Sequence, residues 1–391
     1  MTAMILTSNA ESAAQRLHRR ARQVHPDLTL PAHGSLVDLL SSLPVLSKDD
    51  LVSHLELDEH WLETAVLFSE TSGTTGRALQ TPRGACDLAW NAANQANAYR
   101  RFVHAGVDRV AILHPSVLSP FIEASSIALR HLGIGQIRIF PIPRVCDYRR
   151  IFEVLARYRI TAIMTTPSLA YKVLYEFASA GQELPPCLHK LLLTGEELSC
   201  SSIRHFKRIM RRDALVAPFV YGSSEAATLM LGRHDGLFDP ILDDFIFELH
   251  DTSAQEGKRL VVTWLRDGLM PMVRYDTGDL FDVATALDPV LRFSGRVGLT
   301  ESDREFRTQV ERALHALEVP VYHFEGTFSK SERRLNASVA IVLSDQAHAP
   351  AMEASLREHL PGWQVRLHAN PASMEFLQFS PSPKTEKLTS C

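Results

Sequence analysis

The chain has 391 residues, of which 45% are hydrophobic and 22% charged, and its formal net charge is −4. This balance is typical of a folded globular protein and excludes a disordered chain, and the length predicts two or three folding units. The small negative charge gives no electrostatic reason to bind nucleic acid, and the arginines between Arg204 and Arg212 are interpreted as a solvated helix face.

The cysteines are odd in number and far apart, with no CxxC pair: Cys86, Cys146, Cys187, Cys200 and Cys391. This spacing argues against a disulfide framework or a zinc ribbon and fits a reducing compartment. No signal peptide is expected at the N-terminus, and no apolar run approaches the roughly 18 to 20 residues that a membrane span needs. The sequence therefore predicts a cytoplasmic globular protein that does not cross a membrane.

From residue 107 onward, short apolar runs alternate with segments of helical spacing. Strands are predicted at 107–115, 134–143, 160–168 and 188–198, and helices at 119–133, 148–158 and 169–181. This rhythm favours an α/β fold with a mainly parallel sheet covered by helices. Polar stretches follow apolar runs at 165–168, 194–197 and 221–226, where the strand ends of such a sheet form binding sites.

The pattern changes after residue 296. A helix is predicted at 305–319, strands at 319–330 and 334–344, a helix at 350–360 and a strand at 363–369. This arrangement is typical of a compact α+β unit. We expect the domain boundary between Arg296 and Thr300.

The stretch "LFSETSGTTGRALQTPRG", Leu67 to Gly84, contains six small or hydroxylated residues in a row, from Thr71 to Gly76. Ordering such a loop costs chain entropy, and the loop has no bulky side chain to bury. Its glycines and hydroxyls can present N–H and O–H groups to a phosphate chain, although a plain turn is the alternative. It is not a Walker A loop, because Arg77 stands where a GK[ST] would be expected.

Five motifs occur in a fixed order: "TSGTTG", "TGEE", "YGSSEA", "RYDTGDL" and "SGR". In this order they resemble the acyl-adenylate-forming superfamily, which includes acyl-CoA synthetases, peptide-synthetase adenylation domains and luciferase. The stretches around residues 165–174 and 233–249 look most like the phenylacetate–CoA ligase branch. The resemblance implies a large adenylate-forming domain, residues 1–297, with mainly parallel sheets, and a small mobile α+β domain, residues 298–391.

The resemblance implies the following site. Ser72, Gly73, Thr74, Thr75 and Gly76 would hold the phosphates of ATP, and Glu225 would be the Mg²⁺ ligand. Asp279 and Arg296 would bind the ribose, and the adenine pocket would be lined by Gly195, Glu196, Glu197, Tyr221, Gly222, Ser223 and Ser224, with Tyr221 stacked on the base.

The resemblance also implies a lysine on the small domain that neutralises charge between the carboxylate and the α-phosphate. Lys387 in "PKTEKL" is the candidate, and Lys384 is the alternative. Lys387, Glu225 and Thr74 form the predicted catalytic set. An exposed lysine in a frayed tail is the structural alternative.

The sequence departs from the family after Arg296. The usual hinge residue is replaced by Gly298 or its neighbours, and the Arg-Gly motif that lines the thiol tunnel is absent. The acceptor is therefore left open between coenzyme A and the phosphopantetheine of a carrier protein, and an enzyme that stops at the adenylate is a further alternative. Gly295 and Gly298 can still serve as hinges.

The branch favours aromatic acids, with His114, Phe121 and Thr166 as candidates for the acyl pocket or for ordinary packing. Transfer of the acyl group to a protein cysteine such as Cys391 is a second hypothesis. A degenerate nucleotide- or partner-binding protein is a third, which the joint presence of Glu225, Asp279 and Arg296 disfavours. Relatives are often homodimers.

Overall fold

The structure, a computed structural model, describes residues 4–31, 35–54, 59–70, 79–114, 120–141, 146–211, 213–252, 257–270, 272–285, 289–298, 300–342, 349–377 and 388–390. Its contacts divide the chain into two compact units. The first unit comprises Met1–Phe102, Ser116–Leu132 and Phe219–Leu299, and the second comprises Val103–Pro115, Gly133–Pro218 and Thr300–Cys391.

The first unit is built on an eight-stranded sheet in the order β1-β10-β11-β12-β13-β9-β8-β7. All neighbouring strands pair antiparallel. The strands are β1 (Met4–Leu6), β7 (Val220–Ser223), β8 (Ala227–Gly232), β9 (Phe238–Pro240), β10 (Phe245–His250), β11 (Lys258–Trp264), β12 (Tyr275–Thr285) and β13 (Val290–Arg296). The helices of this unit are α1 (Ala10–Val24), α2 (Leu36–Ser41), α3 (Lys48–His54), α4 (Glu59–Thr64), α5 (Ala85–Arg100) and α6 (Pro120–His131).

Strand β10 shows that this sheet is covered on both faces. Phe245 and Phe247 pack in one apolar cluster with Trp90 of α5, whereas Ile246 packs in another with Leu17 of α1 and other residues of α1 and α2. Because successive side chains of a strand point to opposite faces, β10 is buried along its whole length rather than on alternate residues.

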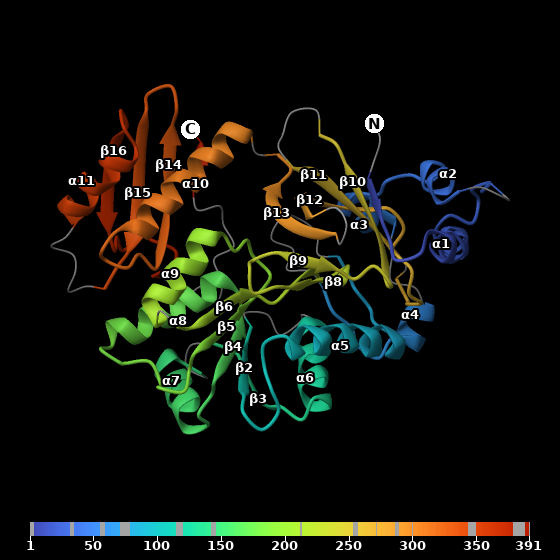
Figure 1. Ribbon diagram of the computed structural model, residues 1–391, viewed down its shortest axis with the longest axis horizontal. Helices are drawn as coiled ribbons and strands as arrows, with labels where there is room; N and C mark the ends of the chain where they lie inside the picture. Colours follow the sequence, from blue (N-terminus) through green and yellow to red (C-terminus); the bar gives the residue numbers. More distant parts are fainter. Residues whose placement is uncertain are drawn as a thin grey trace. The chain divides into compact units, whose positions relative to one another are not determined.

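The second unit contains a five-stranded parallel sheet in the order β3-β2-β4-β5-β6. Its strands are β2 (Arg109–Leu113), β3 (Gly135–Ile139), β4 (Ala162–Thr165), β5 (Lys190–Leu193) and β6 (Leu215–Pro218). The helices α7 (Tyr148–Arg157), α8 (Pro167–Ser179) and α9 (Cys200–Met210) accompany it (Figure 1). The strands and helices predicted between residues 107 and 198 are confirmed, and the sequence pattern failed to separate the antiparallel eight-stranded sheet from this parallel one.

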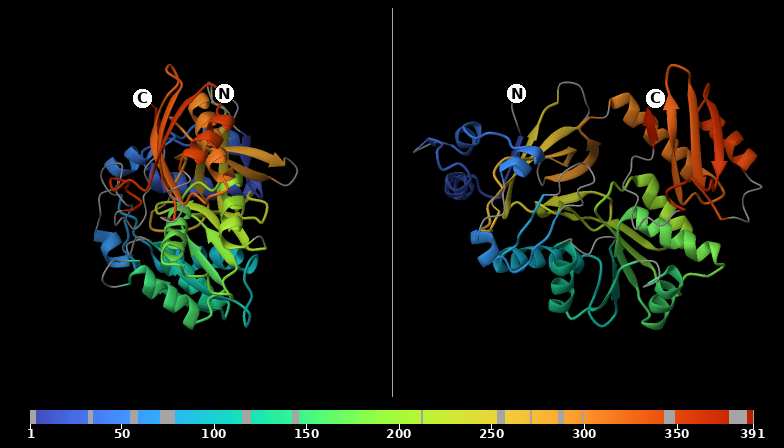
Figure 2. Two further views of the ribbon diagram at one scale, coloured as in Figure 1. Left: turned by 90° about the vertical axis from the view of Figure 1, so that its left-hand side faces the viewer. Right: turned by 180° about the vertical axis from the view of Figure 1, so that it is seen from behind.

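The second unit also contains a four-stranded sheet in the order β16-β15-β14-β17. Strands β14 (His323–Ser329) and β15 (Arg334–Ala340) form an antiparallel hairpin, and β16 (Gln364–Ala369) and β17 (Leu388–Ser390) add to it in parallel. Helices α10 (Glu301–Ala316) and α11 (Ala349–His359) share one apolar cluster with the sheet, and Figure 2 gives two further views of this arrangement. The predicted C-terminal α+β pattern is confirmed.

The segment after β16 packs on the parallel-sheet part of the same unit. Met374 and Phe376 belong to the apolar cluster of the parallel sheet. The buried Lys172 of α8 donates from Nζ to the carbonyl oxygen of Phe376, and its ammonium group lies 4.8 Å from the centre of the Phe376 ring. The Phe376 ring also stacks on the His323 ring, with ring centres 4.7 Å apart. Met374 and Phe376 therefore anchor the 371–377 segment in the core of the parallel sheet.

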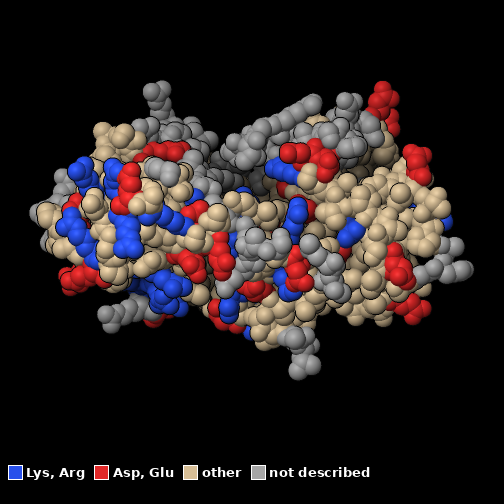
Figure 3. All heavy atoms as spheres, turned by 90° about the horizontal axis from the view of Figure 1, so that it is seen from above, with Lys and Arg blue, Asp and Glu red and all other residues tan. Residues whose placement is uncertain are grey.

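The α/β class, with a parallel sheet and a separate smaller C-terminal sheet, is confirmed. The predicted division at residues 297 and 298 stays a prediction, because the compact unit that resumes at Thr300 also contains the parallel sheet. Among the described residues, no helix has the length and apolar character needed to cross a membrane. Basic and acidic side chains are interspersed over the described part of the face in Figure 3, so their charges offset one another locally.

We expect Phe376→Ala to lower the free energy of unfolding by about 3 kcal/mol or more, because it removes a buried ring and leaves a cavity. Phe68→Ala is the matched control: the Phe68 side chain is 51% exposed, and its loss should change stability by less than about 0.5 kcal/mol. Chemical denaturation of both variants measures the difference. Equal losses would show that the 371–377 segment does not contribute to the core.

Candidate functional site

The predicted phosphate loop, Ser72 to Gly76, lies outside the described residues, as do Lys384, Lys387 and Cys391. The structure does describe the two flanks of the loop. Isolated bridges pair Leu67 with Arg83 and Glu70 with Gln80 in antiparallel fashion. The chain therefore enters and leaves the loop at neighbouring points of the first unit.

Asp279, Arg296 and Tyr221 lie together in the first unit. Asp279 of β12 faces Arg296 of β13 in the strand register, and Arg296 Nε donates to Asp279 Oδ1 at 2.9 Å. The Tyr221 hydroxyl on β7 donates to the other carboxylate oxygen, Oδ2, at 2.8 Å. Three predicted site residues from three strands thus form one hydrogen-bonded group.

The sequence "YDTGDL" explains how β12 presents this carboxylate. Gly278 has φ of +71°, a conformation that favours glycine, and its N–H donates to Asp276 Oδ1 at 3.0 Å. Thr277 Oγ1 accepts the N–H of Asp279 at 3.2 Å. These local bonds form a short turn-like distortion within the strand that fixes the backbone of Asp279 beside β13.

The electrostatics of this group are set by burial. Burial raises the pKa of Asp279 above its ordinary value, and the charge of Glu225 adds to the rise. Arg296 and the Tyr221 hydrogen bond oppose the rise but do not cancel it. Burial and the charge of Asp279 likewise raise the pKa of Tyr221, which keeps its hydroxyl a donor. The Arg296 side chain is 75% exposed, so its charge remains available to a ligand.

Glu225 occupies the turn between β7 and β8 and is buried. The Tyr275 hydroxyl of β12 donates to Glu225 Oε1 at 2.7 Å. Burial raises the pKa of Tyr275, and the adjacent Glu225 charge raises it further. Tyr275 lies in the "RYDTGDL" motif, but the sequence analysis assigned it no role, because nothing local indicates a contact with a residue 50 positions away.

The buried carboxylate of Glu225 is compatible with one mode of magnesium binding, in which the ligand supplies further oxygen atoms. Among the described side chains, no group of three or more His, Cys, Asp or Glu residues is arranged to hold a metal ion. Magnesium is commonly bound by one or two carboxylates together with substrate phosphates and water, rather than by an all-protein cage. Glu225 therefore suits a magnesium ion that is held jointly with a phosphate ligand.

The described structure resembles solved structures of ligases. It matches a 2-hydroxyisobutyryl-CoA ligase in its postadenylation state, in complex with 2-HIB-AMP, with a TM-score of 0.70 and 16% identity, over 98% of this chain and 86% of that one. It matches an anthranilate CoA ligase in complex with anthranoyl-AMP with a TM-score of 0.53 and 15% identity, over 77% of this chain and 63% of that one. No protein-family model and no curated protein sequence matches the chain.

The chain has the fold of these CoA ligases. The predicted resemblance is thereby confirmed at the level of the fold. The same 2-hydroxyisobutyryl-CoA ligase, in complex with 2-HIB-AMP and CoA in its thioesterification state, matches with a TM-score of 0.60 and 17% identity, over 98% of this chain and 91% of that one. At these identities the roles of individual residues remain predictions.

Within this fold, the Gly195–Glu197 loop follows β5 of the second unit. Glu196 accepts the N–H of Ser168 at 2.9 Å and the Ser168 hydroxyl at 2.6 Å, at the start of α8. Thr166 is buried and is the N-cap of the same helix, accepting from the N–H of Leu169. A carboxylate at a helix N-terminus is favourable. The side chains of Glu196 and Thr166 therefore both serve to start α8, whatever else they contact.

The other two candidates for the acyl pocket belong to different units. His114 follows β2 in the second unit and is partly buried. Phe121 lies on α6 of the first unit, edge-on to Phe219 with ring centres 6.3 Å apart. Their assignment to an acyl pocket stays a prediction.

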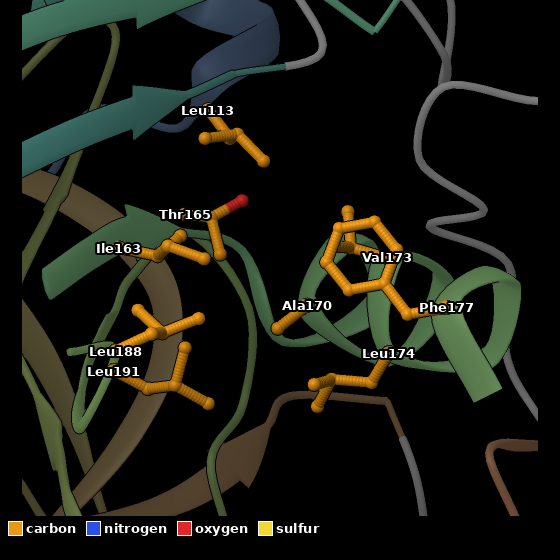
Figure 4. A pocket seen from close by; sticks show the side chains of 9 residues that line it. All are labelled: Leu113, Ile163, Thr165, Ala170, Val173, Leu174, Phe177, Leu188 and Leu191. Carbon is orange, nitrogen blue, oxygen red and sulfur yellow. The ribbon is translucent and has the colours of Figure 1, made fainter. Parts of the chain in front are cut away.

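One small cavity lies between the parallel sheet and α8 of the second unit (Figure 4). Its volume is about 10 Å³, and apart from Thr165 its lining is apolar: Leu113, Ile163, Ala170, Val173, Leu174, Phe177, Leu188 and Leu191. A water needs about this space and two to four polar partners. The cavity is thus a packing gap and contains no predicted site residue.

We expect Tyr221→Phe to raise the pKa of Asp279 further, because it removes a donor that stabilises the carboxylate. The unfolded chain releases the Asp279 proton at the ordinary pKa, so stability falls as pH rises from that value through the raised folded one. The variant should extend this window upward. Carboxyl ¹³C NMR titration measures the pKa.

Tyr99→Phe is the matched control for that titration. Tyr99 is a buried tyrosine of the first unit whose hydroxyl bonds to Ser125, not to Asp279. An Asp279 pKa that responds equally to both substitutions would contradict a direct role of the Tyr221 hydroxyl.

Proposed function

We propose that this protein is an ATP-dependent, AMP-forming acid–thiol ligase, which activates a carboxylic acid as an acyl-adenylate and passes the acyl group to a thiol. The observation that carries the proposal is the pair of buried carboxylates in one unit. Asp279 is held by Tyr221 and Arg296, and Glu225 is held by Tyr275. Glu248 of the same sheet is paired with the buried Arg274, whereas the charge of Glu225 raises the pKa of Asp279, and buried acids perturbed by one another are typical of functional sites.

The Asp279 group suits the ribose of a nucleotide. Each carboxylate oxygen can accept two hydrogen bonds, and each already accepts one from the protein. One site on each oxygen is left for the two adjacent ribose hydroxyls. Arg296, mostly exposed, would reach the same sugar. The proposed adenine-binding residues are Tyr221–Ser224 of the first unit and, by family resemblance, Gly195–Glu197 of the second.

The Tyr221 ring is already packed in the first unit. It meets Phe281 edge-on, with ring centres 4.8 Å apart, while its hydroxyl is held by Asp279. A ring fixed at both its edge and its hydroxyl is pre-organised, so stacking on the base would cost little rotamer entropy.

Glu225 would bind a magnesium ion beside the phosphates of ATP. ATP and the carboxylate substrate are both anions, and they must approach each other there. A magnesium ion held there would supply positive charge as pyrophosphate leaves. The loop from Ser72 to Gly76 would hold the phosphates through N–H and hydroxyl groups, with Thr74 in the catalytic set. Lys387, or alternatively Lys384, would neutralise charge beside the reacting carboxylate.

The acid is proposed to be aromatic, as in phenylacetate–CoA ligases, with His114, Phe121 and Thr166 near the acyl group. An aromatic substrate is consistent with the similarity to a structure described as an anthranilate CoA ligase, whereas the 2-hydroxyisobutyryl-CoA ligase is named for an aliphatic acid. An assay panel therefore needs both classes.

The acceptor is proposed to be coenzyme A or a carrier-protein phosphopantetheine, reached through a mobile domain of residues 298–391. The missing Arg-Gly motif after Gly298 supports a second candidate, an enzyme that releases or hands on the adenylate without coenzyme A. A cytoplasmic location, expected from the sequence, and a homodimer, the state common among relatives, complete the proposal.

Pyrophosphate release tests the function directly. With ATP, Mg²⁺ and a panel of aromatic, hydroxy and fatty acids, we expect release with one acid class, and a strong increase with coenzyme A if coenzyme A is the acceptor. Release that ignores coenzyme A would favour a carrier protein or the adenylate-only candidate. No release with any acid, from protein that binds ATP, would contradict the ligase and support a non-catalytic nucleotide-binding protein.

We expect Glu225→Gln to slow pyrophosphate release roughly 100-fold, because it removes the charge that would hold magnesium, and this factor corresponds to about 2.7 kcal/mol of barrier. Glu248→Gln is the matched control: Glu248 is equally buried in the same sheet but pairs with Arg274. The measurement is the rate of pyrophosphate release by both variants at saturating ATP and acid. Similar losses in both variants would mean that Glu225 acts only through stability.

A further inference from the structure

The turn that carries Glu225 is strained. A Cβ atom at Gly222 would lie 2.0 Å from the carbonyl oxygen of Ala227, so only glycine fits where β7 meets β8. Ala227 itself has φ of +62°, which costs a non-glycine residue roughly 1 kcal/mol. Strain of this kind persists where the surrounding structure holds the backbone in place.

Arg83 restrains the backbone of this turn. Its side chain is buried, and Nη2 donates to the carbonyl oxygens of Ser224 and Glu225, the latter at 2.8 Å. The guanidinium carbon lies 5.3 Å from the ring centre of Trp264, so the group is also held in a stacking position. Arg83 Nη2 therefore donates to two successive carbonyl oxygens of the strained turn.

Arg83 also lies in the flank that leaves the predicted phosphate loop, three residues after the bridge between Glu70 and Gln80. Its N–H donates to the carbonyl oxygen of Leu67 at 2.8 Å, and its own carbonyl accepts from Leu67 at 3.1 Å. The next residue, Gly84, is the N-cap of α5, with its N–H bonded to Asp87. The backbone of Arg83 therefore pairs with the other flank of the loop, while its side chain donates hydrogen bonds to the Glu225 turn.

Stability alone does not account for an arginine here. Burying a guanidinium costs several kcal/mol, and an apolar side chain of similar volume is often at least as stable. Within the described residues, Arg83 Nη1 has no hydrogen-bond partner, which adds to the cost. Burial lowers the pKa of Arg83, while the charges of Asp87 and Glu225 oppose that shift.

We propose that Arg83 is a positioning residue for Glu225: it ties the closing strand of the phosphate loop to the turn that carries this carboxylate. The inference rests on the proposed function, in which Glu225 holds magnesium together with the phosphates. Arg83 fixes the backbone on both sides of the Glu225 peptide, and Tyr275 fixes the side chain. The carboxylate is then presented in one orientation before the nucleotide arrives.

The test compares Arg83→Lys and Arg83→Met with Arg20→Lys and Arg20→Met. Arg20 is an arginine of α1, as buried as Arg83, which bonds to Gln23 and Asp267 and not to the Glu225 turn. A lysine keeps the charge but lacks the planar fork of donors, so Arg83→Lys probes geometry in a protein with its charge intact.

Hydrogen exchange in the absence of nucleotide is the first measurement. The N–H of Ala226 donates to Ser223 Oγ, and that of Thr228 donates to Asn91 Oδ1. Both amides should exchange roughly tenfold faster in the Arg83 variants, because the turn is released, and should be unchanged in the Arg20 variants. Unchanged exchange in Arg83→Lys and Arg83→Met would overturn the proposal.

The magnesium dependence of pyrophosphate release is the second measurement. Residues that orient a metal ligand typically contribute about 10- to 100-fold to metal affinity, so the Mg²⁺ concentration for half-maximal rate should rise about tenfold in Arg83→Lys but not in Arg20→Lys. An unchanged magnesium requirement would overturn the positioning role. If the unsubstituted protein releases no pyrophosphate, the proposed function fails, while the exchange measurement still decides whether Arg83 holds the turn.

Discussion

Two buried carboxylates constrain this structure more than any other feature. Asp279 and Glu225 lie in the antiparallel sheet of the first unit, and each buried charge needs donors to offset its lost hydration. Those donors come from β13, β7 and β12 as Arg296, Tyr221 and Tyr275. The strand order of the sheet brings these distant donors to the two acids, and the donors to Asp279 offset only part of the rise in its pKa that burial causes.

The parallel part of the fold was predictable from the sequence because its signals are local. Most strands there are short apolar runs. Strands β2 to β5 are each followed by a helix, and the spacing of apolar residues indicates such a helix, as in α7, which buries Ile151, Val154 and Leu155. The eight-stranded sheet carries no such signal. Strand β10, with the sequence FIFELH, is buried on both faces and shows no alternation of apolar and polar residues over its first three positions, and its partner β1 lies about 240 residues away along the chain. Pairing over that distance has no signature in a single sequence.

The candidate site divides in the same way. Asp279 and Arg296 were named together from their motifs, and the strand register places them opposite each other. The sequence did not show that Tyr221 donates to Asp279, nor that Arg83 reaches the Glu225 turn, since both contacts depend on tertiary structure. Glu196 illustrates the converse: a motif residue whose carboxylate is engaged in starting α8. A motif identifies the residue, but only the fold identifies its hydrogen-bond partner.

The C-terminal sheet raises a physical question for the acceptor step. A swinging domain is implied by the family resemblance, yet Glu311 of α10 accepts from both Ser199 and Ser202 at the start of α9, each at 2.7 Å. Phe376 is buried, and its carbonyl oxygen accepts a hydrogen bond from Lys172 Nζ of α8. Movement of the sheet away from α8 must therefore either expose Phe376 to water, at a cost of about 2 kcal/mol for that side chain alone, or bend the chain on both sides of residues 371–377 and leave them behind. The second route still breaks the stacking of His323 of β14 on the Phe376 ring, so movement of the sheet costs core packing by either route.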